Sequence, residues 1–93
     1  MTGYELKSSL VVLGFTKAPS SEYHNEVFRN TDYIGMDIAL YVDHYNVRIV
    51  WWYEPRKKVG KCYYVNREIA MCPDVESLLS DFFCEMKKVY GIA

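Results

Sequence analysis

The sequence predicts an α+β domain of two layers, in which an N-terminal and a C-terminal helix pack on one face of an antiparallel sheet of three to four strands. Three observations lead to this prediction. Apolar and polar residues alternate with period two through much of residues 33–54, which is typical of strands. The chain starts with a helix-capping pattern, and it ends with a long apolar stripe at helical spacing. The expected order is α-(β)-β-β-β-α, in a single domain of residues 1–93.

The first expected element is a helix of residues 3–13. Thr2 and Glu5 have the spacing of a capping box, and Gly14 stands where a left-handed residue commonly ends a helix. The leucines between them recur on one face of such a helix: Leu6, Leu10 and Leu13.

The next segment leaves two alternatives open. Residues 17–21 have the composition of a loop. Residues 22–29 fit either an irregular edge strand or an ordered loop that covers a sheet edge. We expect residues 30–32 to turn into the central hairpin.

The central hairpin spans residues 33–54, and its alternation predicts its register. The inward positions of the two arms are apolar: Ile34, Met36, Ile38, Leu40 and Val42, then Val47, Ile49, Trp51 and Tyr53. If Asp43 faces Asn46, every inward residue of one arm meets an inward residue of the other. A shift by one residue would pair core with solvent, so the pattern favours this register alone. Trp51 is then a core residue, and Trp52 points to the outer face.

A third long strand is expected at residues 61–67, antiparallel to the second arm, after a polar connection at residues 55–60. Its facing stays open: either Cys62 and Tyr64 or Tyr63 and Val65 point inward. In both cases a tyrosine lies beside Trp52 on the outer face. Residues 68–72 form a connection of undetermined type.

The last element is expected to be a helix that Asp74 caps and Gly91 ends. Lys87 and Lys88 complement its C-terminal dipole. Its apolar stripe consists of Val75, Leu78, Leu79, Phe82, Phe83, Met86, Val89 and Tyr90. A stripe this broad must pack on another surface, and the inward face of the hairpin is the available one.

Composition indicates a globular chain, with 51% hydrophobic and 25% charged residues. A formal net charge of −1 favours neither non-specific DNA binding nor binding to anionic membranes. Cys62, Cys72 and Cys84 are not spaced as a disulfide framework, so we interpret them as buried structural thiols in a reducing, cytoplasmic setting. We find no signal-peptide pattern, and no stretch of ~20 apolar residues that would span a membrane.

No pattern indicates an enzyme, a metal or a cofactor. His24, His44 and the cysteines lack metal-ligand spacing, and there is no nucleophile elbow or phosphate-binding glycine loop. Asp37 and Asp43 share one strand face but lie ~20 Å apart, too far for a carboxylate pair. We therefore expect a non-catalytic protein.

The outer face of the sheet is the candidate binding surface. It would present Tyr41, Arg48, Val50, Trp52 and a tyrosine, Tyr63 in our preferred assignment. An apolar centre with a rim of tyrosine and arginine has the composition of a protein-binding hot spot. Such a face could instead be covered by residues 22–29 of the same chain, or form a homodimer with a second copy.

The expected function is therefore that of an accessory or inhibitory protein that binds a larger protein or ribonucleoprotein. Phage and mobile-element inhibitors of host defence enzymes, the anti-CRISPR kind, share this size and class, which is an analogy of class alone. The alternative is single-stranded nucleic-acid binding through Arg56, Lys57 and Lys58 beside the aromatic residues. Double-stranded-RNA-binding domains share the order of elements, but they start their last helix with a lysine-rich motif, and residues 73–76 here are acidic.

Overall fold

The computed structural model describes residues 1–19, 26–53 and 61–90, with the backbone alone described at residues 53, 61–64, 89 and 90. Five strands form one antiparallel sheet of order β1-β2-β3-β4-β5. The strands are β1 (Thr16–Ala18), β2 (Glu26–Tyr33), β3 (Met36–Val42), β4 (Asn46–Tyr53) and β5 (Lys61–Glu68). The helices are α1 (Gly3–Val12), the short 3₁₀ helix η1 (Ile69–Met71) and α2 (Val75–Tyr90). The predicted α+β class, with a helix at each end, is confirmed, and the sheet has slightly more strands than expected.

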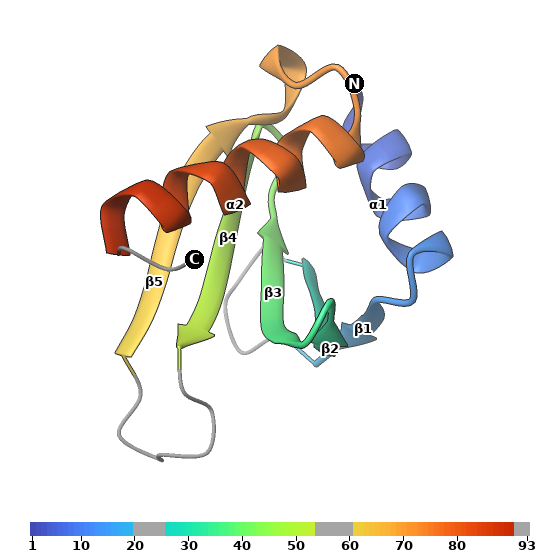
Figure 1. The fold of residues 1–93 in the computed structure, drawn as a ribbon. Coiled ribbons are helices and arrows are strands. Elements are labelled where there is room, and N and C mark those ends of the chain that lie inside the picture. Colours follow the sequence, from blue (N-terminus) through green and yellow to red (C-terminus); the bar gives the residue numbers. More distant parts are fainter. Residues whose placement is uncertain (20–25, 54–60, 91–93) are drawn as a thin grey trace.

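Both helices cover the same face of the sheet. Figure 1 shows α2 running across β3, β4 and β5, while α1 lies beside it toward β1. Between the helices and the sheet lies one apolar core, whose largest fully buried side chains are Phe82, Leu6, Leu10, Ile38, Leu40, Ile49, Leu79 and Val47. None of the helices formed by the described residues lies on the other face of the sheet.

The ends of α1 match their sequence patterns. The Thr2 side chain accepts from the backbone N–H of Glu5, and the Glu5 carboxylate accepts from the backbone N–H of Thr2, which completes the capping box. At the other end Gly14 has a φ of +91°, and its N–H donates to the Val11 carbonyl. The next N–H, that of Phe15, donates to Leu10, which is the Schellman pattern.

The register of β3 and β4 is the predicted one. Ile38 pairs with Trp51, Leu40 with Ile49, and Val42 with Val47. The turn is closed by the N–H of Asp43, which donates to the Asn46 carbonyl. Trp51 is 7% exposed, so its predicted place in the core is confirmed.

The start of the hairpin differs from the prediction, because the chain turns at Ile34 and Gly35. Both residues have positive φ, +52° and +77°, and Tyr33 pairs with Met36 across them. This is the backbone of a two-residue hairpin turn of type I′. Ile34 is therefore 75% exposed, and its predicted core position is wrong. Residues 30–32, expected to be the turn, belong to β2.

An irregularity in β2 decides which side chains reach each face. The pairing between β2 and β3 shifts between Asn30 and Tyr33. Tyr33 packs against the core from an odd position, while Phe28, 3% exposed, is buried there from an even one. Only a shift of one residue allows both, since strand positions alternate between faces.

The structure answers the open question about residues 22–29 for part of that segment. From Glu26 onward it is a strand, as one of the two alternatives expected. Residues 27–29 pair with both β1 and β3, so this strand is not at the edge of the sheet, and the alternative of a covering loop is wrong for residues 26–29. The edge is β1 instead. Residues 22–25 and His24 lie outside the described part.

At the C-terminal end the predicted helix is confirmed. Asp74 caps α2, since its carboxylate accepts from the N–H of Ser77 at 2.7 Å. Cys72 is buried, as expected of a structural thiol. Cys84 is exposed, and its predicted burial is wrong, because it lies at the margin of the apolar stripe of α2.

Gly35→Ala is expected to lower the free energy of unfolding by about 1–2 kcal/mol, since a Cβ disfavours the left-handed backbone of the turn. No atom lies within 4 Å of the added Cβ, so the cost is conformational alone. Gly3→Ala is the matched control, because it also has open space, and it should be neutral or slightly stabilising at the start of α1. Urea denaturation followed by circular dichroism measures both. Equal costs for the two variants would contradict the turn assignment.

Candidate functional site

A cluster of Arg29, Asp37 and Trp52, from here on the Arg29 cluster, organises the outer face of the sheet. The Arg29 guanidinium donates to both carboxylate oxygens of Asp37, from Nε at 3.2 Å and from Nη2 at 2.8 Å. The same guanidinium lies over the Trp52 ring, 4.7 Å from its centroid. Arginine is suited to this double role, because its planar group stacks on an aromatic ring while its edge donates to a carboxylate.

The strand register places the three groups together. Asp37 and Trp52 are paired neighbours on β3 and β4, while Arg29 pairs with Ala39 on the other side of β3. Ala39 is small, so the long Arg29 side chain can cross β3 to reach both partners. Without the shift in β2, Arg29 would stand on the core face. The irregularity in β2 is thus required for the cluster.

The cluster holds its aromatic ring at the surface. The Asp37 side chain is 11% exposed and that of Arg29 45%, while Trp52 is half-buried. The hydrogen bonds to Asp37 raise the pKa of the Arg29 guanidinium above its usual range. At this exposure the ion pair and the cation–π contact each contribute about 0.5–1 kcal/mol. Their main effect is to fix the Trp52 ring in one orientation.

Next to the cluster is a small polar hollow of about 50 Å³. Its lining comes from β3, β4, β5 and the β3–β4 turn, and consists of Tyr41, Asp43, Asn46, Arg48 and Asn66. Tyr41, Arg48 and Asn66 form one row across three strands, and the Arg48 Nε donates to the Asn66 side-chain oxygen at 3.3 Å. The hollow has room for a few water molecules. It therefore makes this part of the face polar and is too small to be a ligand pocket.

The Asp43 carboxylate rigidifies the turn beside this hollow. It accepts from the backbone N–H groups of Asn46 at 2.6 Å and Tyr45 at 2.8 Å. These two hydrogen bonds hold the pKa of Asp43 below its usual value.

A pH prediction follows for Asp43. A carboxyl whose pKa is lower in the folded state contributes stability above its unfolded pKa, and this contribution is lost as the pH falls through the folded value. The stability advantage of the wild type over Asp43→Asn should therefore be full at about pH 6 and shrink between about pH 4 and about pH 2. Urea denaturation at each pH measures it. A difference that stays constant down to about pH 2 would contradict the role of the charged carboxylate.

The structure corrects two of the predicted binding residues. Val50 is 8% exposed, so it is not the solvated centre of the face that we expected. Tyr63 pairs with Trp51 and Tyr64 with Val50, so the register places position 64, and not 63, on the outer row. Of the two facings left open, that with Tyr63 and Val65 inward is the one the register supports.

The other predicted residues divide into two groups. Tyr41 is half-buried, Arg48 is exposed, and the two are paired neighbours on the outer face, separated from Trp52 by Val50. Arg56, Lys57 and Lys58 lie outside the described residues.

Sequence reasoning missed Arg29, which belongs to the segment whose type was left open. An available clue was Gly35 inside an apparent strand, since an isolated glycine there suggests a turn or bulge. A turn at that point creates a strand before it and brings Arg29 opposite the arm that carries Asp37. The exact partner still depends on the shift in β2.

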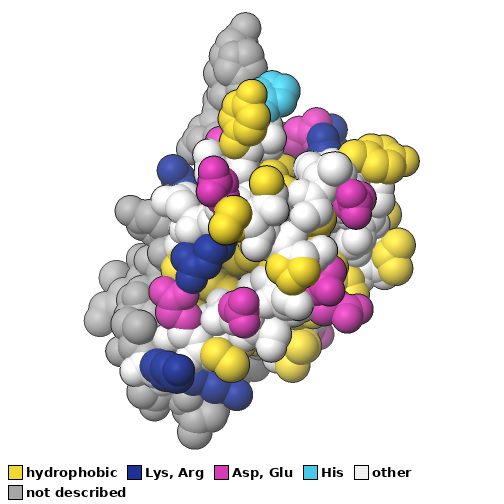
Figure 2. Space-filling model, turned by 90° about the horizontal axis from the view of Figure 1, so that it is seen from above, with side chains coloured by type: hydrophobic (Ala, Val, Ile, Leu, Met, Phe, Trp, Pro, Cys, Tyr) yellow, Lys and Arg dark blue, Asp and Glu magenta, His cyan; other side chains and the backbone are white. Residues whose placement is uncertain are grey.

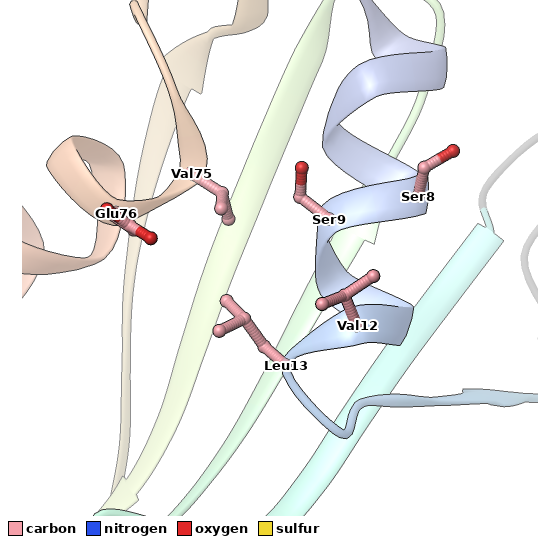
Figure 3. A pocket seen from close by; sticks show the side chains of 6 residues that line it. All are labelled: Ser8, Ser9, Val12, Leu13, Val75 and Glu76. Atoms are coloured by element: carbon pink, nitrogen blue, oxygen red, sulfur yellow. The ribbon is translucent and has the colours of Figure 1, made fainter.

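A second hollow of about 250 Å³ lies between α1 and α2. Figure 3 shows Ser9 and Leu13 on the side of α1 that faces α2, with Val75 and Glu76 opposite them. Its volume is below the roughly 300 Å³ at which small-molecule sites begin. Among the described residues that line it, Glu76 is the one titratable group, and acid–base chemistry requires more than one such group in place.

Within residues 1–19, 26–53 and 61–90, no group of three His, Cys, Asp or Glu residues is placed to hold a metal ion. No helix in the described part of the chain is both long and apolar enough to cross a membrane.

Comparison with protein-family models, with curated proteins and with solved structures finds no match to this chain.

Proposed function

We propose that this protein is a non-catalytic interaction module that binds a larger protein or ribonucleoprotein through the outer face of its sheet. Such a module would act as an accessory or inhibitory protein, as the sequence suggested. The observation that carries the proposal is the Arg29 cluster, in which Trp52 is held at the surface by a guanidinium that Asp37 fixes in turn.

The residue types and their rigidity support this proposal. Tryptophan, tyrosine and arginine are the side chains that most often dominate protein–protein binding energy. Here Trp52, Tyr41, Arg29 and Arg48 stand on the same face of the sheet, opposite the two described helices. A side chain that is already fixed loses less conformational entropy on binding, so the same contact contributes more affinity.

The experiment is affinity capture with three forms of the tagged protein in extracts of its host. The wild type should enrich one larger protein, and Trp52→Ala should lose it. Tyr4→Ala is the matched control, because Tyr4 is an aromatic residue on α1 with 78% exposure and it lies away from the outer face. Loss of the captured protein with both variants, or with neither, would contradict the proposal. Circular dichroism of each variant verifies that the fold is kept.

The alternative of single-stranded nucleic-acid binding has less support. Arg29 is already paired with Asp37. The side of the molecule that Figure 2 shows, seen from above the view of Figure 1, also has acidic and basic side chains interspersed. A groove that binds the phosphate backbone is lined with positively charged side chains along its length.

This alternative has its own test. It expects a labelled single-stranded oligonucleotide to bind with an affinity that falls steeply with salt, and that falls again in a Lys57→Gln, Lys58→Gln variant. Fluorescence anisotropy measures this. Absence of binding at low salt would eliminate nucleic acid as the partner.

A further inference from the structure

The two edges of the sheet differ in how they resist the addition of another strand. The β1 edge is three residues long, has an exposed lysine at Lys17, and is followed by Pro19. Short edges with lysine and proline are a common protection against strand addition. The β5 edge is eight residues long and pairs with β4 without interruption. Its middle, residues 62–66, is uncharged and contains neither proline nor glycine.

The β5 edge therefore offers a row of backbone donors and acceptors, of which the Asn66 carbonyl accepts from the Arg67 guanidinium at 3.0 Å. In the described sheet β5 has a neighbour on one side only. Alternate residues of an edge strand direct their N–H and C=O groups away from the sheet, which is a template for a further antiparallel strand. Aromatic and β-branched residues such as Tyr63, Tyr64 and Val65 favour strand pairing.

Self-pairing of this edge is restricted by symmetry. Two antiparallel copies of β5 side by side are related by a two-fold axis perpendicular to the sheet, so each face of one copy continues into the same face of the other. Residues that pair across the axis must then share a face, and positions in β5 alternate between faces. In every allowed register, one residue of β5 therefore faces its own copy across the axis.

Charge decides between the two longest registers. An axis at Tyr64 pairs Lys61 with Arg67 twice, and like charges directly opposite each other are destabilising. An axis at Val65 pairs the segment from Cys62 to Glu68 with itself and opposes no like charges. It places position 67 opposite position 63 and position 62 opposite position 68.

The helix layer leaves this arrangement room. In Figure 1, α2 crosses β5 and its C-terminal end extends past the strand on the core side. A strand added to β5 would thus lie beneath α2, partly covered on the face that must avoid water. The Arg67–Glu85 ion pair ties α2 to β5 at this edge.

We propose that the β5 edge binds a second copy of this chain, antiparallel and centred on Val65, to form one continuous sheet across two protomers. The homodimer considered from the sequence used the outer face, whereas this one uses the edge and leaves that face open. It places both Trp52 side chains on the same side of the joined sheet. The pairing does not depend on the proposed function.

Oligomeric mass gives the first part of the test. Sedimentation of the full chain should show monomers at about 1 µM and increasing dimer toward about 1 mM, as for an interface of modest area. Trp52→Ala, which alters the outer face, should leave this equilibrium unchanged. A monomer at every concentration would overturn the proposal, and so would a dimer that Trp52→Ala dissociates.

Cross-linking gives the register. In a background of Cys62→Ser, Cys72→Ala and Cys84→Ser, Asn66→Cys should form a cross-linked dimer with a short bis-maleimide, because position 66 is exposed on the outer face and lies diagonally across the axis from its own copy. Lys17→Cys on the β1 edge is the matched control and should stay monomeric. No cross-link at position 66, or equal cross-linking at position 17, would overturn the pairing.

Discussion

Trp51→Ala is expected to lower the free energy of unfolding by about 3–5 kcal/mol, the largest effect of any substitution considered for this chain. Trp51 is 7% exposed, pairs with Ile38 and belongs to the core between the sheet and the helices. Truncation to alanine removes its buried area and leaves a cavity that a close-packed core fills only in part.

Its neighbour is the matched control. Trp52→Ala should cost only about 1–2 kcal/mol, since Trp52 is half-buried and loses chiefly its contact with Arg29. Urea denaturation should be followed by far-ultraviolet circular dichroism, because either variant removes part of the fluorescence. Similar costs for both tryptophans would mean that the two faces are not distinguished as described.

For the Trp52→Ala variant, the loss of binding affinity should be larger than the loss of folding stability. For the protein captured by the wild type, we expect its affinity to fall at least ~30-fold, about 2 kcal/mol, which is the threshold of a hot-spot residue. The reason is that Trp52 is the largest side chain of the outer face and is already held in place by the Arg29 cluster. Titration calorimetry or surface plasmon resonance with the purified partner measures the change.

Arg29→Lys tests whether Arg29 supports binding through its charge or by positioning the Trp52 ring. Lysine retains the positive charge but lacks the planar group that both stacks on Trp52 and spans the Asp37 carboxylate. An intermediate loss of about 3- to 10-fold would support a positioning role for Arg29. A Trp52→Ala affinity within about twofold of the wild type would contradict the hot-spot assignment.

The parts of the fold that could be predicted are those with a local pattern. Thr2 with Glu5 and Gly14 with Phe15 each determine a helix end through the backbone groups of neighbouring residues. The alternation from Met36 to Trp52 determines a register, because a shift would expose the core. These features require no information from distant parts of the chain.

The parts that failed depend on contacts that no local pattern contains. Ile34 fits a strand by hydrophobicity, and only the left-handed turn shared with Gly35 places it in solvent. Arg29 becomes part of the outer face through the shift in β2, whose position follows from packing Tyr33 and Phe28 on the same side. The candidate site was therefore located at Trp52, while the residue that holds Trp52 was missed.

The most direct test of the outer-face proposal is photo-cross-linking in the host with benzoylphenylalanine at one of two tyrosine positions. Tyr41 lies half-buried on the outer face beside the Arg29 cluster, and Tyr4 is exposed on α1. We predict that position 41 cross-links to one larger protein, that position 4 does not, and that Trp52→Ala removes the product at position 41. The same products from both positions, or none from position 41, would contradict the assignment of the outer face as the binding surface.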